Sequence, residues 1–143
     1  MVDDHRKTVI IIDNNESICK KYKELFIERL PNVILRIYNN TSDGLTAIFK
    51  NNFDVAIINS NLYEDHLSSK VLVRKCVLSG KPVICTENNI INKYSVLYNN
   101  SDIKNKNIKF IDNHYDMLET VQKFFSKKID PLIISAELNI ISK

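Results

Sequence analysis

Two kinds of apolar pattern alternate along the chain. Short runs of β-branched and other apolar residues, with little alternation, are typical of strands covered on both faces. Five such runs predict strands at 8–12, 33–38, 53–58, 81–86 and 108–111. Apolar residues at helical spacing follow each run, and they predict helices at 16–30, 41–51, 67–78, 90–98 and 115–129.

Local signals support several of these boundaries. Asn15 is suited to cap the first helix, and Pro31 ends it. Gly80 suits the turn that ends the third helix. Apolar spacing assigns the inward side of the third helix to Leu67, Val71, Val73, Cys76 and Leu78. The same reasoning assigns the inward side of the last helix to Met117, Leu118, Val121, Phe124 and Phe125.

Strictly alternating strands and helices predict an α/β fold, with a five-stranded parallel sheet and helices on both faces. In such folds the carboxyl ends of the strands line the functional crevice. The candidate site residues are therefore those that end or follow the strands: Asp13, Asn14, Asn59, Ser60, Asn61, Thr86, Glu87 and Asp112.

The length of 143 residues fits one domain, which we place at residues 1–130. The composition is that of a globular protein, with 44% hydrophobic and 26% charged residues. Residues 131–143, "PLIISAELNIISK", fall outside the alternating pattern and are apolar enough that exposure to water would be unfavourable. They form a C-terminal extension that is a docked tail, a dimer contact or a linker stub.

Charge and cysteine content exclude several classes of protein. The net charge of +3 is only mildly basic, and the short lysine clusters fit solvated surface, so we expect no direct nucleic-acid binding. The three cysteines have no short spacing, which argues against disulfides or a zinc site and for a reducing compartment. With no apolar run of membrane-spanning length and no signal peptide, we expect a cytoplasmic protein without membrane contact.

Several motifs together resemble the receiver domain of bacterial two-component response regulators. "VIIIDNNESI" is similar to that family's first strand and the acids after it, and "FDVAIINSN" to the third strand with its phosphoacceptor. "DGLTAI", "KPVICTE" and "KFIDN" resemble the second helix, the fourth strand and the fifth strand. The resemblance covers residues 7–129 and implies a flavodoxin-like fold with strand order 2-1-3-4-5.

The residues that carry the family's chemistry are changed. Asp13 keeps the first acid, but Asn14 stands where the resemblance implies a second. Asn59 occupies the position equivalent to the phosphoacceptor. An amide is not a nucleophile toward phosphorus, so we expect no phosphorylation at Asn59. With most of the carboxylates gone, we expect no metal site and weak or absent Mg²⁺ binding.

Two further family positions depend on the register of the match. The switch hydroxyl is either Thr86, with a one-residue deletion, or Glu87 without one. The family's lysine falls near Asp112, followed by Asn113 instead of proline, and Lys109 could serve only with a shifted strand register.

We expect the remaining polar groups to satisfy one another. Buried amides persist when they are hydrogen-bonded, which predicts a closed network of Asp13, Asn14, Asn59 and Thr86. Asp13 is then expected to cap the first helix rather than to bind metal.

These observations predict a pseudo-receiver: a non-enzymatic module of a two-component or related pathway that acts by phosphorylation-independent protein–protein interaction. The resemblance implies a partner or homodimer surface on the fourth helix, fifth strand and fifth helix, made of Lys93, Tyr94, Tyr98, Lys109, Phe110 and Tyr115. The alternative is a working phosphoacceptor regulator with an atypical acceptor or metal site. A nucleotide-binding domain is disfavoured, because "DNNES" lacks the glycines of a phosphate-binding loop. The pathway, the partner and the oligomeric state stay open.

Overall fold

The computed structural model describes residues 6–64, 67–86, 107–111 and 113–129. The strands in these ranges are β1 (Thr8–Ile12), β2 (Ile34–Tyr38), β3 (Val55–Asn59), β4 (Tyr63–Glu64), β5 (Leu67–Ser68), β6 (Val83–Thr86) and β7 (Ile108–Phe110). The helices are α1 (Glu16–Arg29), α2 (Thr41–Lys50), α3 (Ser69–Leu78) and α5 (His114–Ile129). The helix predicted at 90–98 and the extension at 131–143 lie outside the described residues.

Five parallel strands form the main sheet in the order β2-β1-β3-β6-β7. This confirms the predicted order 2-1-3-4-5, since β4 and β5 belong to a separate two-stranded hairpin. β3 is buried along its whole length, as the apolar run at 53–58 predicts. Its carboxyl end, Asn59, therefore lies at the centre of the sheet's carboxyl edge.

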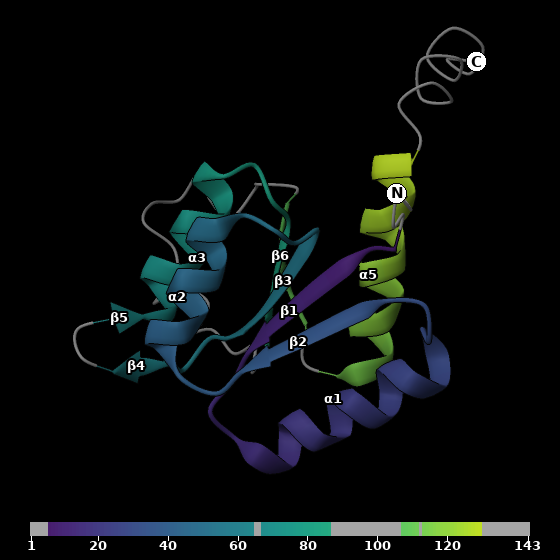
Figure 1. Ribbon diagram of the computed structural model, residues 1–143, viewed down its shortest axis with the longest axis horizontal. Coiled ribbons are helices and arrows are strands. Elements are labelled where there is room, and N and C mark those ends of the chain that lie inside the picture. Colours follow the sequence, from purple (N-terminus) through teal and green to yellow (C-terminus); the bar gives the residue numbers. More distant parts are fainter. Residues whose placement is uncertain (1–5, 65–66, 87–106, 112, 130–143) are drawn as a thin grey trace, which may run out of the picture.

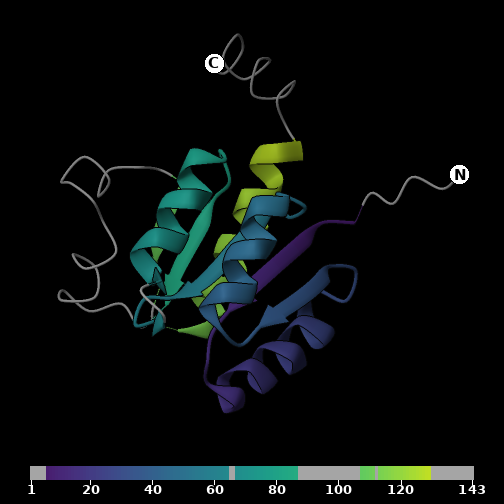
Figure 2. The same cartoon turned by 60° about the vertical axis from the view of Figure 1, so that its left-hand side comes forward.

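Helices cover both faces of the sheet (Figures 1 and 2). On one face α1 and α5 pack over alternate strand residues, including Ile11 and Ile57. On the other face α2 and α3 pack over the intervening residues, including Ile12 and Ile58. All five residues predicted to face inward from the last helix are buried: Met117, Leu118, Val121, Phe124 and Phe125.

Three helices begin with an asparagine whose side-chain oxygen accepts a backbone N–H of the first turn. Asn15 accepts from Ile18 in α1, as predicted. Asn113 accepts from the N–H of Asp116, and its own amide donates to the Asp116 carboxylate at 2.8 Å. Asn40 makes the same pair of bonds with Asp43. Asparagine supplies both a donor and an acceptor, so one side chain fixes the turn and the acid of the first helical turn.

The prediction for α3 was wrong in two respects. Leu67 is not helical, because residues 67–68 pair with residues 63–64 in the hairpin and the helix begins at Ser69. Leu78 does not face inward, because 66% of it is exposed. The buried side instead follows Ser69, Leu72, Val73 and Cys76, at spacings of three, four and seven residues.

The end of α3 confirms the role expected of Gly80. Its φ of 72° is left-handed, and the N–H of the next residue, Lys81, donates back to the carbonyl of Cys76 at 2.9 Å. This is the hydrogen-bond pattern of a glycine-terminated helix.

Gly44 allows α2 to approach β1 closely. A Cβ at this position would lie 2.7–2.9 Å from three atoms of the Ile12 side chain, which is fully buried. Contacts that short require the neighbour to move, and Ile12 is enclosed by the core.

We expect Gly44→Ala to lower the free energy of unfolding by about 1–3 kcal/mol through overpacking, despite the better helix propensity of alanine. Urea unfolding measures this cost. In an Ile12→Val background, which lacks the Cδ1 atom at 2.7 Å, the same substitution should cost less. An equal cost in both backgrounds would contradict the packing explanation.

Candidate functional site

Asp13 and Asn59 meet at the carboxyl edge of the sheet. β1 and β3 are neighbours in parallel register, so the residue that follows β1 comes beside the last residue of β3. Asp13 is 2% exposed and Asn59 is 5% exposed. The main-chain N–H of Asp13 also donates to the carbonyl of Tyr38, which ties the end of β1 to β2. A carboxylate and an amide are thus buried together at the place where the crevice was predicted.

The Asp13 carboxylate organises the turn between β1 and α1. Its Oδ1 accepts the N–H of Asn15 at 2.9 Å, and Asn15 in turn caps α1. The same oxygen lies 3.4 Å from Nδ2 of Asn59, at the long end of a hydrogen bond. Asp13 therefore stabilises the start of the helix indirectly, by holding the residue that caps it.

Both ends of the Asn59 amide have partners. Its nitrogen donates to Asp13, and its oxygen accepts the N–H of Asn61 at 2.7 Å. The second bond is the turn that Asx residues form with the backbone two positions later. A carboxylate at position 59 could accept from Asn61 equally well, but it could not donate to Asp13 and would place two buried negative charges side by side. The amide gives the same backbone turn without that repulsion.

Ser69 holds the loop between β3 and α3 and was missed by the sequence reasoning. Its hydroxyl donates to the carbonyl of Asn59 at 2.6 Å and accepts the N–H of Leu62 at 2.8 Å. The Ser69 N–H donates to the carbonyl of Leu62 at 3.0 Å. Ser69 is 2% exposed, so these bonds replace water for buried main-chain groups. A serine at the start of an apolar helical run could have indicated this role. The same position is also typical of an ordinary helix cap, so the sequence alone does not distinguish the two.

The other predicted site residues are placed differently. Thr86 pairs with Asn59 in the sheet, and its main-chain carbonyl accepts both the N–H and the hydroxyl of Ser60. Asn14 and Asn61 are exposed. Glu87 and Asp112 lie outside the described residues.

The predicted closed network is therefore only partly correct. Asp13 and Asn59 are joined, but among the described residues the Thr86 side chain is not a partner of Asn59, and Asn14 faces solvent. The physical reason is local: backbone N–H groups two residues further along already donate to these oxygens, at 2.9 Å for Asp13 and 2.7 Å for Asn59.

A cavity of about 200 Å³ lies beside Asp13. Residues of α1, β6 and α5 and the segments that follow β1 and β7 meet around it, and its lining consists of Asp13, Ile18, Tyr22, Thr86, Ile111, Asn113, His114 and Met117. His114 packs against Tyr22 with ring centroids 5.1 Å apart and an angle of 68° between the rings. His114 was not singled out from the sequence, because nothing adjacent in the chain shows that the start of α5 folds back toward Asp13.

The environment of His114 disfavours its charged form. Burial lowers the pKa of its imidazole below the usual value, and the positive charge of Lys21 lowers the pKa further. The side chain is therefore mostly neutral near pH 7 and presents one donor and one acceptor nitrogen.

The described part of the predicted partner surface does not form one patch. The side chain of Phe110 packs against the core on the α2 and α3 face. Tyr115 lies on the opposite face, where the guanidinium of Arg29 is 5.3 Å from its ring centroid. Lys109 is exposed in the middle of β7, opposite Ile84 and not at the carboxyl end of the strand. Lys93, Tyr94 and Tyr98 lie outside the described residues.

Metal-ligating side chains do not gather in the described ranges: no group of three or more His, Cys, Asp or Glu residues there could hold an ion. Among the described residues, the carboxylate of Asp13 and the amide of Asn59 are the side-chain donors that meet at the carboxyl edge. Mg²⁺ usually takes one or two carboxylates together with phosphate and water, so a single carboxylate already shared between two N–H donors is a poor fit. Within the same ranges, no helix is both long and apolar enough to cross a membrane.

Comparison with known proteins gives a match in structure but not in sequence. No protein-family model matches the chain, and no curated protein matches it. The signal receiver domain of an HD domain-containing protein from Pseudomonas fluorescens Pf-5 superposes with a TM-score of 0.67 at 10% identity, covering 86% of this chain and 97% of that one. The receiver domain of the Francisella response regulator 1452 gives a TM-score of 0.62 at 19% identity, covering 86% and 99%.

A third solved structure agrees. The signal receiver domain of a putative Luxo repressor protein from Vibrio parahaemolyticus gives a TM-score of 0.62 at 12% identity, covering 90% of this chain and 97% of that one. The chain has the receiver fold. The flavodoxin-like topology expected from the resemblance is thereby confirmed, and Asn59 ends the receiver fold's central strand.

Ser69→Ala should lower the free energy of unfolding by about 1–3 kcal/mol, because it leaves the buried carbonyl of Asn59 and N–H of Leu62 without their partner. Urea unfolding is the measurement, and Ser17→Ala, an exposed serine in α1, is the matched control with a change within about 0.5 kcal/mol. Equal, small effects of the two substitutions would show that the Ser69 bonds do not hold the loop.

His114 should titrate below its ordinary pKa in an NMR pH titration. Because the folded pKa lies below the unfolded one, the unfolded chain binds more protons, and the stability from neutral His114 is present above about pH 6.5 and lost as the pH falls toward the folded pKa. Lys21→Gln should raise the midpoint, whereas Lys20→Gln, its exposed neighbour, should not. A midpoint at or above the ordinary value would contradict this account.

Proposed function

We propose that this protein is a receiver-like signalling module that is not phosphorylated and acts through contact with a protein partner. The observation that carries the proposal is the state of Asn59: a buried amide at the end of the central strand, hydrogen-bonded at both ends. This is the position that the resemblance to response regulators assigns to the phosphoacceptor.

The chemistry of the amide supports the absence of phosphoryl transfer. A carboxylate oxygen attacks phosphorus readily, but the lone pair of an amide nitrogen is delocalised and the amide is not a competent nucleophile. Ser60 is the nearest hydroxyl along the chain, and it is buried and donates to the carbonyl of Thr86. No step of phosphoryl transfer is therefore assigned to these residues.

Weak or absent Mg²⁺ binding belongs to the same proposal. The buried carboxylate of Asp13 already accepts from Asn15 and from Asn59. A metal ion would have to displace these donors and would gain only one negative charge in return. The site therefore favours hydrogen bonds over a cation.

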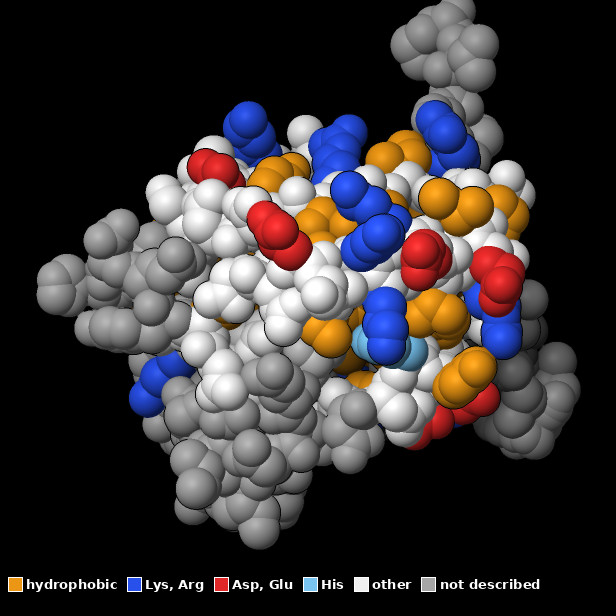
Figure 3. Space-filling view, turned by 90° about the horizontal axis from the view of Figure 1, so that it is seen from below, with side chains coloured by type: hydrophobic (Ala, Val, Ile, Leu, Met, Phe, Trp, Pro, Cys, Tyr) orange, Lys and Arg blue, Asp and Glu red, His pale blue; other side chains and the backbone are white. Residues whose placement is uncertain are grey.

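The partner in this proposal is a protein, and the module is non-enzymatic and cytoplasmic. All three cysteines are free and buried, as expected in a reducing compartment. Figure 3 shows basic, acidic and hydrophobic side chains interspersed on one face and no continuous basic patch there, which is unlike a nucleic-acid-binding surface. The start of α5 offers an anchor for a partner, because Tyr115 is 67% exposed.

The direct test is incubation with acetyl phosphate and Mg²⁺, followed by intact-protein mass spectrometry. We expect no stable phosphoryl adduct, and we expect the same partner to be captured by cross-linking with and without the phosphodonor. An adduct on Ser60, Thr86 or Asp13 would instead support the alternative of a regulator with an atypical acceptor.

Tyr115→Ala should weaken capture of that partner at least tenfold, as the loss of a central aromatic anchor commonly does. Phe49→Ala is the matched control, because Phe49 is 63% exposed but lies on α2, on the other face of the sheet. Equal effects of the two substitutions would contradict the placement of the partner at α5.

Asn59→Asp should lower the free energy of unfolding in the presence of EDTA, because it places a second carboxylate against buried Asp13. Millimolar Mg²⁺ should restore part of the loss, since a cation that binds only the folded state stabilises it. Thermal unfolding with and without Mg²⁺ measures both effects, and Asn61→Asp at the exposed neighbour should show neither. Stabilisation of the unsubstituted protein by the same Mg²⁺ concentration would contradict the proposal.

A further inference from the structure

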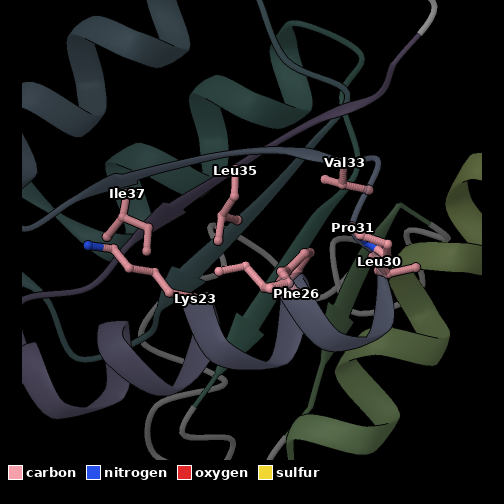
Figure 4. A pocket seen from close by; sticks show the side chains of 8 residues that line it. Lys23, Phe26, Leu30, Pro31, Val33, Leu35 and Ile37 are labelled. Atoms are coloured by element: carbon pink, nitrogen blue, oxygen red, sulfur yellow. The ribbon is translucent and has the colours of Figure 1, made fainter.

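An apolar groove lies between α1 and β2 on the face of the sheet that α5 also covers. Its volume is about 400 Å³. Figure 4 shows the α1 side chains and the β2 side chains pointing toward one another across it. Its lining is almost wholly apolar and consists of Lys23, Phe26, Ile27, Leu30, Pro31, Val33, Leu35 and Ile37.

The two walls of the groove are incompletely covered. Ile27 on α1 is 74% exposed, the most exposed large hydrophobic residue in the described part of the chain. Val33, Leu35 and Ile37 are only half-buried, whereas every residue of the central strand β3 is buried. Exposed apolar surface that is contiguous, rather than scattered, marks a place where another apolar group binds.

β2 also has an open hydrogen-bonding edge in the described part of the chain, because it ends the sheet order. The N–H of Ile34 donates to the carbonyl of Lys7, and the carbonyl of Tyr38 accepts the N–H of Asp13. The peptide groups of Ile34 and Tyr38 therefore point toward β1. Peptide groups of successive strand residues point to opposite sides. The peptide groups of Leu35 and Ile37 therefore face away from β1, beside the groove that their side chains line.

We propose that the C-terminal segment 131–143 of the same chain returns along α5 and that its last residues, 138–143, bind in this groove in extended form, adding a strand to the open edge of β2. Going beyond the proposed function, this assigns a place to the one apolar segment that the alternating pattern leaves over. The segment reads "PLIISAELNIISK", and Leu138 and Ile140 in its last part are two residues apart. Residues at that spacing point to the same face of a strand and would enter the groove together.

The length of the segment is sufficient. It follows α5, whose first turn lies against α1, with Tyr115 beside Arg29 and His114 beside Tyr22. The 16 residues of α5 span about 24 Å. Thirteen extended residues reach about 43 Å, so the segment can return along α5 and still have about 19 Å left for β2. A five-residue strand such as β2 needs about 17 Å.

The test is a spin label on the full chain. Ile27→Cys is labelled with a nitroxide, and Leu78→Cys, similarly exposed but on α3 of the opposite face, is the matched control. The native thiols react slowly with the nitroxide reagent, because all three are buried. Burial also raises the pKa of the Cys76 thiol to about 12. We expect the label at position 27, but not at position 78, to broaden the NMR signals of residues 138–141 at least twofold.

Four results would overturn the proposal. Equal broadening from both labels, or none from position 27, would leave the groove without this occupant. Broadening that disappears when labelled chains are diluted with unlabelled ones would assign the groove to a second copy. Ile27→Glu provides the complementary measurement: protection of the 138–141 amides from hydrogen exchange should fall at least tenfold. Unchanged protection would also overturn the proposal, and Leu78→Glu should leave the protection unchanged.

Discussion

The contact between the Asp13 carboxylate and the Asn59 amide is the constraint on which the carboxyl edge of this protein depends. Parallel pairing of β1 with β3 forces the residues at the two strand ends together, and the surrounding strands and loops exclude water from both. In that setting a second carboxylate would need a cation, whereas an amide needs only a donor and an acceptor nearby. With an amide at position 59, the described part of this edge forms a self-contained hydrogen-bonded turn.

The loops around this contact are built on the same neutral chemistry. Asn59 fixes the backbone at Asn61, Ser69 closes the loop before α3, and Asp13 holds the residue that caps α1. Each of these bonds joins a side chain to a main-chain group rather than to another side chain. The loops that would surround a phosphoryl group in a working receiver are thus held in place without one, which is consistent with signalling by contact.

α1 lines both the cavity beside His114 and the groove against β2. Tyr22 lies between α1 and the cavity beside His114, and Phe26, one turn further on, lines the groove against β2. Both rings belong to the same core cluster, which links α1 to α5 and the sheet. α1 therefore forms a wall of both cavities.

Much of the fold follows from the sequence by itself. Five buried apolar runs with helical segments between them determine a parallel sheet covered on both faces, because main-chain groups must pair and both faces must be apolar. The same pattern predicted that Asp13, Asn59 and Thr86 would lie at the carboxyl ends of strands, and the chemistry of an amide excludes position 59 as a nucleophile. The order of the strands came from the resemblance and not from the pattern.

Only the tertiary structure decided which polar groups became partners. The sequence favoured a network among side chains, but Asn14 is exposed and the oxygens of Asp13 and Asn59 accept backbone N–H groups of their own loops. The sequence did not predict the roles of Ser69 and His114 or the groove at β2, because each depends on where a helix begins or how closely it packs. Local patterns carry the period of a helix but not its position on the sheet, and these contacts are set by that position.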